Sequence, residues 1–336
     1  MKLATLKDGT RDGCLVVVSR DLRRATFAKE IAPTLLDALE RWSSVESALL
    51  ALYEQVNGER RDASFHFDVR KAMAPLPRSY QWLDGSAFAN HGRLMERAFD
   101  SGVKNSYDRD PLIYQGASDD FIGPCDDVVL PSEADNMDFE GEVAVVTDEV
   151  PMGTSAAEAH AHIKLLMLVN DVSLRAHAAR EMKTGFGWIQ AKPTTAFSPV
   201  AVTPDELGAA WVNGRVELPL HVERDGQAFG RPNGREMTFG FPDLIRYASY
   251  SRRLRAGAIV GSGTFSNEDR SVGSACITEC RAIELLDGGE PKTPFMRFGE
   301  RVRINMLDAA GRSIFGAIDQ MYVQYEGTRT AQRQPG

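Results

Sequence analysis

The stretch Asn136-Met137-Asp138-Phe139-Glu140-Gly141-Glu142-Val143-Ala144-Val145-Val146 joins alternating acidic residues to an apolar run. In a β-strand, residues two apart lie on the same face. We therefore expect a strand over 139–147, with Asp138, Glu140 and Glu142 pointing the same way and neighbouring carboxylates roughly 6–7 Å apart. The apolar continuation is typical of a strand that is buried on both faces of a sheet.

Two interpretations of these carboxylates stay open from this stretch alone. One is a solvated strand face, on which acidic residues need no further explanation. The other follows from burial, because carboxylates aligned on a buried strand repel one another and must be protonated or neutralised. A bound hard cation with oxygen ligands, such as Mg²⁺, Mn²⁺ or Ca²⁺, is the usual solution.

Two further acidic residues are candidates for the same site. Asp171 comes directly after the apolar segment 165–169 and Asn170. Asp84 lies in Trp82-Leu83-Asp84-Gly85-Ser86. Taken alone, each is more typical of a cap or a turn than of a metal ligand.

Length, composition and charge exclude several classes of protein. At about 150 residues per domain, 336 residues indicate roughly two domains. Asp and Glu outnumber Lys and Arg by 47 to 39, giving a net charge of −8, which argues against a nucleic-acid partner and an anionic membrane surface. No apolar run approaches the roughly 20 residues of a membrane span, and no signal peptide is recognised. The four cysteines form no CxxC pair, so we expect reduced thiols and a cytoplasmic protein.

The order of the expected elements favours an α+β fold with a mostly antiparallel or mixed sheet. Helices are expected over 33–53, 155–170 and 242–253, and strands over 2–6, 15–19, 128–130, 139–147, 196–203, 216–224, 259–263, 275–286, 301–307 and 313–320. The prolines in 70–80 indicate a boundary. We therefore expect a small N-terminal domain over 1–75, a catalytic domain over 76–327 and a frayed tail over 328–336.

Four segments, in order along the chain, carry a family resemblance. They are Asp84-Gly-Ser-Ala-Phe-Ala-Asn-His91; Asp138-Phe-Glu140-Gly-Glu142; Asn170-Asp171-Val-Ser-Leu-Arg175 followed by Lys192; and Gly261-Ser-Gly-Thr264-Phe-Ser266 followed by Ser271-Val-Gly-Ser-Ala-Cys-Ile-Thr-Glu279. Together these segments resemble the fumarylacetoacetate hydrolase family, from about Asp84 to Gln320. The resemblance implies a mixed β-sandwich roll with a small N-terminal α+β domain.

The resemblance also implies a role for each matching residue. The ligands of a divalent cation (Mg²⁺, Mn²⁺ or Ca²⁺) would be Asp84, Glu140, Glu142 and Asp171. The cation would chelate the two oxygens of a small-molecule β-diketo acid. His91 would be the general base that activates water, oriented by Glu279, and Lys192 would hold the substrate and its developing charge. The substrate contacts would be Tyr114, Arg175 and Thr264.

The activity implied first is hydrolysis of the C–C bond of fumarylacetoacetate to fumarate and acetoacetate, a step of tyrosine and homogentisate breakdown. Members of the family are usually homodimers, so a homodimer is expected here. Three alternatives within the family are acylpyruvate hydrolysis, oxaloacetate-type decarboxylation and a hydratase-isomerase step. An alternative from another class is a non-catalytic, metal-stabilised dimer module.

Overall fold

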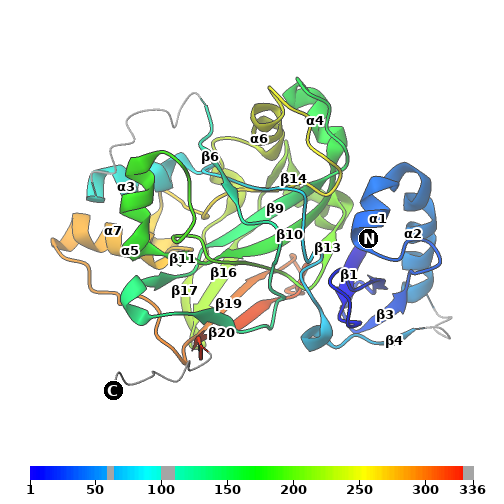
Figure 1. Ribbon diagram of the computed structural model, residues 1–336, viewed down its shortest axis with the longest axis horizontal. Helices are drawn as coiled ribbons and strands as arrows, with labels where there is room; N and C mark the ends of the chain where they lie inside the picture. Colours follow the sequence, from blue (N-terminus) through cyan, green and yellow to red (C-terminus); the bar gives the residue numbers. More distant parts are fainter. Residues whose placement is uncertain (59–63, 100–109, 328–336) are drawn as a thin grey trace, which may run out of the picture.

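The computed structural model of the protein describes residues 1–58, 64–99 and 110–327 (Figure 1). Its larger sheet has eleven strands, with β12 (Thr195–Phe197) paired to β10 and the others following one path. In spatial order these are β4 (Phe65–His66), β3 (Arg24–Phe27), β2 (Cys14–Val18), β1 (Lys2–Leu6), β13 (Ala201–Val202), β10 (Ile163–Asp171), β9 (Gly141–Thr147), β18 (Ile259–Gly261), β5 (Trp82–Gly85) and β6 (Ile113–Gly116). The sheet is mixed. Strands β5 and β18 pair in parallel, whereas β18 pairs antiparallel with β9 and β5 pairs antiparallel with β6.

A second sheet of five strands packs against the first. In spatial order it contains β17 (Gln227–Gly230), β16 (Leu220–Arg224), β19 (Arg301–Met306), β20 (Ile318–Gln324) and β7 (Val128–Leu130). Two short ladders pair β8 (Met137–Asp138) with β11 (Ser173–Leu174) and β14 (Trp211–Val212) with β15 (Arg215–Val216).

The helices lie around the sheets, with α1 and α2 beside β1 to β3 and with α3, α5 and α7 gathered at the opposite side of the view (Figure 1). Their bounds are α1 (Leu35–Glu40), α2 (Trp42–Asn57), α3 (Ala89–Phe99), α4 (Ala156–His162), α5 (Arg175–Thr184), α6 (Phe241–Ala248) and α7 (Ile277–Gly288). The 3₁₀ helices are Val69–Lys71, Glu133–Asp135, Pro204–Ala210, Gly234–Glu236 and Arg270–Val272. Within the described ranges, no helix combines the length and the apolar character that crossing a bilayer requires.

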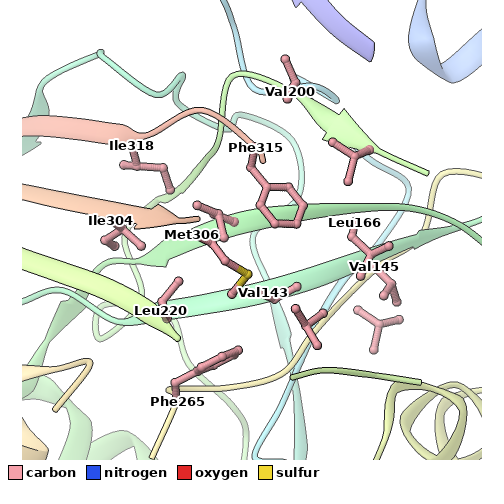
Figure 2. Close-up of a cluster of buried hydrophobic side chains, with 14 of the residues drawn as sticks. Val143, Val145, Leu166, Val200, Leu220, Phe265, Ile304, Met306, Phe315 and Ile318 are labelled. Atoms are coloured by element: carbon pink, nitrogen blue, oxygen red, sulfur yellow. The ribbon is translucent and has the colours of Figure 1, made fainter. Parts of the chain in front are cut away.

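Strands β9 and β10 are buried on both faces, and their side chains alternate between two cores. Val143, Val145 and Leu166 belong to the core that contains the buried residues of the five-stranded sheet (Figure 2). Ala144 and Leu165 belong to a second core, which includes the buried residues of α1 and α2. This double burial explains the unbroken apolar runs in the sequence.

Truncation of a side chain at the centre of the first core is expected to lower the free energy of unfolding strongly. Leu166 is fully buried, so Leu166→Ala is expected to lower the free energy of unfolding by about 2–5 kcal/mol, measured by urea denaturation. The matched control is Leu50→Ala, because Leu50 on α2 is 45% exposed and should change stability by less than about 0.5 kcal/mol. Equal effects of the two substitutions would contradict this description of the core.

The N-terminal segment extends the large sheet. The predicted strands over 2–6 and 15–19 form the antiparallel pair β1–β2, and the predicted helical region over 33–53 contains α1 and most of α2. Strand β1 also pairs with β13, with Lys2 opposite Val202 and Leu3 opposite Ala201. The N-terminal segment is therefore joined to the rest of the chain by a shared ladder as well as by a shared core.

The helix predicted over 155–170 is wrong in its second half. Ser155 and Glu158 form the expected capping box and start α4, but α4 ends at His162 and β10 begins at Ile163. The apolar run 165–169 forms a central strand, with β9 on one side and β13 and β12 on the other. Periodicity cannot distinguish such a run from a buried helix, because both are apolar on every side.

The strand predicted over 275–286 is also wrong, because this segment forms helix α7 from Ile277 to Gly288. The helix starts where the carboxylate of Asp138 accepts hydrogen bonds from the backbone N–H groups of Ile277 (2.8 Å) and Thr278 (3.0 Å). A carboxylate at this end satisfies otherwise unpaired N–H groups and complements the helix dipole. The cap comes from a distant residue, so the local alternation was misleading.

Other predicted elements are present with different bounds. The segment 196–203 is divided into β12 and β13 around Pro199, and 216–224 is divided into β15 and β16 before and after Pro219. The last strand begins at Ile318, after Gly316 with φ +73°, and the helix predicted over 242–253 ends at Ala248. The predicted tail, 328–336, lies outside the described residues.

Candidate active site

Four buried carboxylates converge where strands β5 and β10 end and strand β9 begins. Asp84, Glu140, Glu142 and Asp171 each offer an oxygen atom, and these atoms all lie within 4.8 Å of one another. The structure thus brings together all four residues that the sequence analysis predicted as metal ligands. Their binding of a metal stays a prediction.

Strand pairing explains how residues so distant in sequence meet. Glu142 lies opposite Val169, two residues before Asp171, and the backbone N–H of Asp171 donates to the carbonyl of Glu140 at 3.1 Å. Asp84 lies on β5, which is separated from β9 by β18, and Gly261 of β18 lies beside Asp84. A Cβ atom on Gly261 would lie 2.4 Å from Asp84 Oδ1, so only glycine leaves room for this carboxylate.

Burial and mutual repulsion raise the pKa of two of these carboxyl groups. Burial first, and then the charges of Asp171 and other neighbouring carboxylates, raise the pKa of Asp84 well above its usual value. The pKa of Glu142 is raised well above its usual value by burial and then by Asp84 and Asp171. Both carboxylate oxygens of Glu142 are buried, and neither has a hydrogen-bond partner among the residues that the structure describes. Such orphaned oxygens in an all-carboxylate cluster fit a divalent cation, which takes oxygen ligands and offsets the repulsion.

Two positively charged side chains, those of Lys192 and Arg175, bind carboxylates of the cluster. Lys192 Nζ donates to Glu140 Oε2 at 2.5 Å and to Asp171 Oδ2 at 2.6 Å. Arg175 donates from Nε to Asp138 Oδ2 at 2.9 Å and from Nη2 to Glu140 Oε1 at 2.5 Å. Burial alone would raise the pKa of Glu140, but Lys192 and Arg175 outweigh it and hold this pKa below its usual value. Glu140 is therefore ionised, and it is the most strongly paired carboxylate of the four.

The expectation that Asp138, Glu140 and Glu142 point the same way holds only in part, because Arg175 binds both Asp138 and Glu140 but Asp138 lies outside the carboxylate cluster. The chain leaves the long ladder before Gly141, so that Asp138 pairs with Ser173 in a separate two-stranded ladder. Its carboxylate accepts hydrogen bonds from the start of α7 and from Arg175 instead of joining the cluster. Asp138 thereby links the helix that carries Glu279 to the arginine that holds Glu140.

His91, which is partly buried, and Glu279, which is fully buried, form a pair next to the cluster. His91 lies in the first turn of α3, Glu279 lies in the first turn of α7, and the two helices pack together. His91 Nδ1 lies 2.6 Å from Glu279 Oε2, and Glu279 is only 1% exposed. His91 is also among the groups whose charge lowers the pKa of Glu140, which places it within electrostatic reach of the carboxylates.

The three predicted substrate contacts have different surroundings. Tyr114 of β6 lies opposite Asp84 and donates its hydroxyl to Asp171 Oδ2 at 2.5 Å. The guanidinium of Arg175 binds the carboxylates of Asp138 and Glu140. Thr264 is buried in a segment that runs beside the start of β9, where the N–H of Phe265 donates to the carbonyl of Gly141 at 3.2 Å. The contacts of these residues with a substrate stay predictions.

Two further residues hold the carboxylates in place and were not predicted. Thr195 Oγ1 donates to Asp171 Oδ1 at 2.9 Å, across the β10–β12 pairing. The backbone N–H of Gly263 donates to Asp84 Oδ1 at 3.0 Å. Neither is detectable from sequence spacing, because each contact depends on strands that pair over long separations.

Comparison with known proteins gives this arrangement a family. Residues 81–320 match the family described as fumarylacetoacetate (FAA) hydrolase C-terminal, and residues 1–78 match fumarylacetoacetase N-terminal domain 2. The chain belongs to the fumarylacetoacetate hydrolase family. The predicted resemblance is therefore confirmed, and so is the α+β fold class with its N-terminal domain.

Curated relatives within this family have more than one activity. A 2,4-didehydro-3-deoxy-L-rhamnonate hydrolase from Sphingomonas sp. (strain SKA58) is 32% identical over 158 residues, covering 46% of this chain and 53% of the relative. The human mitochondrial oxaloacetate tautomerase FAHD2B is 28% identical over 159 residues, covering 46% of this chain and 48% of the relative. The chain spans about half the length of these curated relatives.

Solved structures of the fumarylacetoacetate hydrolase fold cover nearly the whole chain. Maleylpyruvate hydrolase from Sphingobium sp. SYK-6, in complex with manganese(II) and pyruvate, has a TM-score of 0.64 and 16% identity, over 96% of this chain and 99% of that one. A 5-carboxymethyl-2-hydroxymuconate delta-isomerase from Mycobacterium smegmatis has a TM-score of 0.59 and 18% identity, over 97% of this chain and 100% of that one. At these identities the likeness shows the fold alone.

Proposed function

We propose that this protein is a divalent-metal-dependent hydrolase that cleaves the C–C bond of a β-diketo acid. The observation that carries the proposal is the His91–Glu279 pair, 2.6 Å apart, next to the four buried carboxylates. A histidine held by a carboxylate is suited to taking a proton from water, which hydrolysis requires and tautomerisation does not.

Glu279 gives His91 a defined orientation and tautomer. Because His91 Nδ1 faces Glu279 Oε2, this nitrogen carries the proton of the hydrogen bond and Nε2 is left to accept one from water. Glu279 is buried, so its charge can stabilise the protonated imidazole that results. The water then adds to the carbonyl carbon of the acyl half of the substrate.

Cleavage breaks the bond between that carbonyl carbon and the adjacent methylene carbon. The electron pair stays on the methylene side as an enolate, and the proton held by His91 returns to that carbon, so the products are two carboxylic acids. A divalent cation held by Asp84, Glu140, Glu142 and Asp171 would supply Lewis-acid stabilisation of the developing negative charge. Lys192 Nζ lies against Glu140 and Asp171 and would add a second positive charge at the same place.

We propose fumarylacetoacetate as the first substrate to test, with acylpyruvates and oxaloacetate as alternatives. The activities named for the similar proteins, which include hydrolases, a tautomerase and an isomerase, justify this panel. The homodimer and the identity of the cation, whether Mg²⁺, Mn²⁺ or Ca²⁺, likewise remain proposals.

Product analysis distinguishes hydrolysis from the other reactions of the family. The metal-loaded protein is incubated in D₂O with fumarylacetoacetate, maleylpyruvate or oxaloacetate, and the products are identified by mass spectrometry. We expect two carboxylic acids from a diketo acid, with one deuterium at the former methylene carbon beyond the uncatalysed exchange. Accelerated deuterium uptake into intact oxaloacetate, with no cleavage of either diketo acid, would favour tautomerisation and contradict the proposal.

A further inference from the structure

The loop that leads into Lys192 is held at one point by a single side chain, Glu181. Glu181 lies in α5, and its carboxylate accepts hydrogen bonds from the backbone N–H groups of Ile189 (2.9 Å), Gln190 (2.8 Å) and Ala191 (3.1 Å). These residues immediately precede Lys192. A carboxylate that receives three backbone N–H groups fixes a segment that otherwise has no regular structure.

Ala191, the residue before Lys192, is held through both its backbone N–H and its backbone carbonyl. The N–H of Ala191 binds Glu181, and the carbonyl of Ala191 accepts from the N–H of Leu174 at 2.9 Å. Earlier in the loop, two apolar side chains are exposed to solvent: Phe186 is 99% exposed and Ile189 is 80% exposed. Trp188 packs edge-on against the ring of Tyr114, with the ring centroids 6.2 Å apart, and Ala191 is buried, so the loop is positioned by these contacts together with those of Glu181.

Helix α5 connects this loop to the carboxylate cluster. At its first residue, Arg175 binds Glu140, and later in the same helix Glu181 binds the segment before Lys192. Lys192 itself reaches back to Glu140 and also lies over the ring of Tyr114, with Nζ 5.4 Å from the ring centroid. The loop and the cluster are thus attached to one rigid element.

We propose that Glu181 is a positioning residue, which sets the place of Lys192 Nζ at the carboxylate cluster by holding the backbone of residues 189–191. This inference rests on the proposed function for its effect on catalysis. Loss of the contacts would let Lys192 move away from the site while leaving its charge and the four carboxylates in place. A displacement of about 1 Å in such a group can cost on the order of 100-fold in rate.

The chain offers a matched control for the test. Glu284 of α7 accepts from the backbone N–H groups of Lys292 (2.6 Å) and Thr293 (2.9 Å), so it also holds the loop that follows its own helix. That loop leads to none of the predicted site residues. Glu181→Ala and Glu284→Ala therefore remove the same kind of contact at two places.

The first measurement does not depend on activity. In the full-length protein, hydrogen exchange at residues 189–191 and acylation of Lys192 by acetic anhydride are followed by mass spectrometry. Glu181→Ala is expected to accelerate both by at least threefold, whereas Glu284→Ala should accelerate exchange only at 292–293. Unchanged acylation of Lys192 in Glu181→Ala would overturn the proposal, even if turnover fell. A wild-type protein without hydrolytic activity would instead contradict the proposed function and leave this result intact.

The second measurement separates positioning from general destabilisation. With a substrate that the wild type cleaves, Glu181→Ala should lower kcat by about 10–100-fold with a smaller change in KM. The kcat of Glu181→Gln should lie between that of the wild type and that of Glu181→Ala. In the Lys192→Ala background, Glu181→Ala should have almost no further effect, because the residue acts through Lys192. Additive losses in kcat, or an equal loss in Glu284→Ala, would show a merely structural role and overturn the proposal.

Discussion

Replacing His91 by alanine is expected to lower kcat by about 10²–10⁴-fold while divalent-cation binding stays within about twofold of wild type. In the proposed mechanism the imidazole takes the proton from water, whereas the proposed metal ligands are the four clustered carboxylates. The rate is measured with whichever substrate the wild type cleaves, and binding is measured by calorimetric titration with Mn²⁺. The two readouts together separate the chemistry from the integrity of the site.

The controls for His91 use another histidine and its own partner. His160→Ala removes an exposed histidine on α4 and should leave kcat unchanged. Glu279→Ala should also lower kcat, but adding it to His91→Ala should cause little further loss, since the pair acts as one unit. Undiminished turnover in His91→Ala would show that this histidine does not activate water, and the hydrolytic mechanism would have to be abandoned.

Replacing Glu142 by glutamine is expected to have opposite effects on function and on stability. Cation affinity should fall by more than about 100-fold, because even residues that only support metal ligands typically cost 10–100-fold when lost. The metal-free protein, in contrast, should gain about 1–3 kcal/mol in its free energy of unfolding, since a neutral group replaces a buried carboxyl group that has no partner within residues 1–58, 64–99 and 110–327. Mn²⁺ titration and urea denaturation with EDTA present measure the two effects.

The control for Glu142 is Glu149→Gln, at a side chain that is 52% exposed and pairs with Arg255. This exposed substitution should change neither cation affinity nor stability by a measurable amount. A Glu142→Gln variant that binds the cation as tightly as wild type would remove this residue from the ligand set. A large loss of metal-free stability would mean that its carboxylate is satisfied in the fold.

The residues of the site were more predictable than the elements that carry them. Asp84, Glu140, Glu142 and Asp171 were recognised by the spacing of family motifs, and the structure brings them together. The same spacing indicated His91 and Glu279, which meet through the packing of α3 against α7. A motif records residues that meet in space, so it survives an error in the local secondary structure.

The incorrect predictions have a common physical cause in tertiary contacts. The apolar run at 165–169 is a strand because two cores bury it, and α7 is a helix whose start is capped by Asp138, more than a hundred residues earlier. Asp138 lies outside the cluster because its carboxylate binds Arg175 and the start of α7. Local alternation and periodicity contain no information on such distant partners.

Removal of the divalent cation is expected to abolish the cleavage of fumarylacetoacetate. The loss of its diketone absorbance is followed with Mg²⁺ present, after addition of excess EDTA, and after restoration with Mn²⁺. We predict turnover with Mg²⁺, abolition by EDTA and recovery with Mn²⁺, because the buried carboxylates need a cation to hold the substrate. Turnover that persists in EDTA, together with no binding of Mg²⁺ or Mn²⁺ by the protein, would show that Asp84, Glu140, Glu142 and Asp171 do not form a catalytic metal centre.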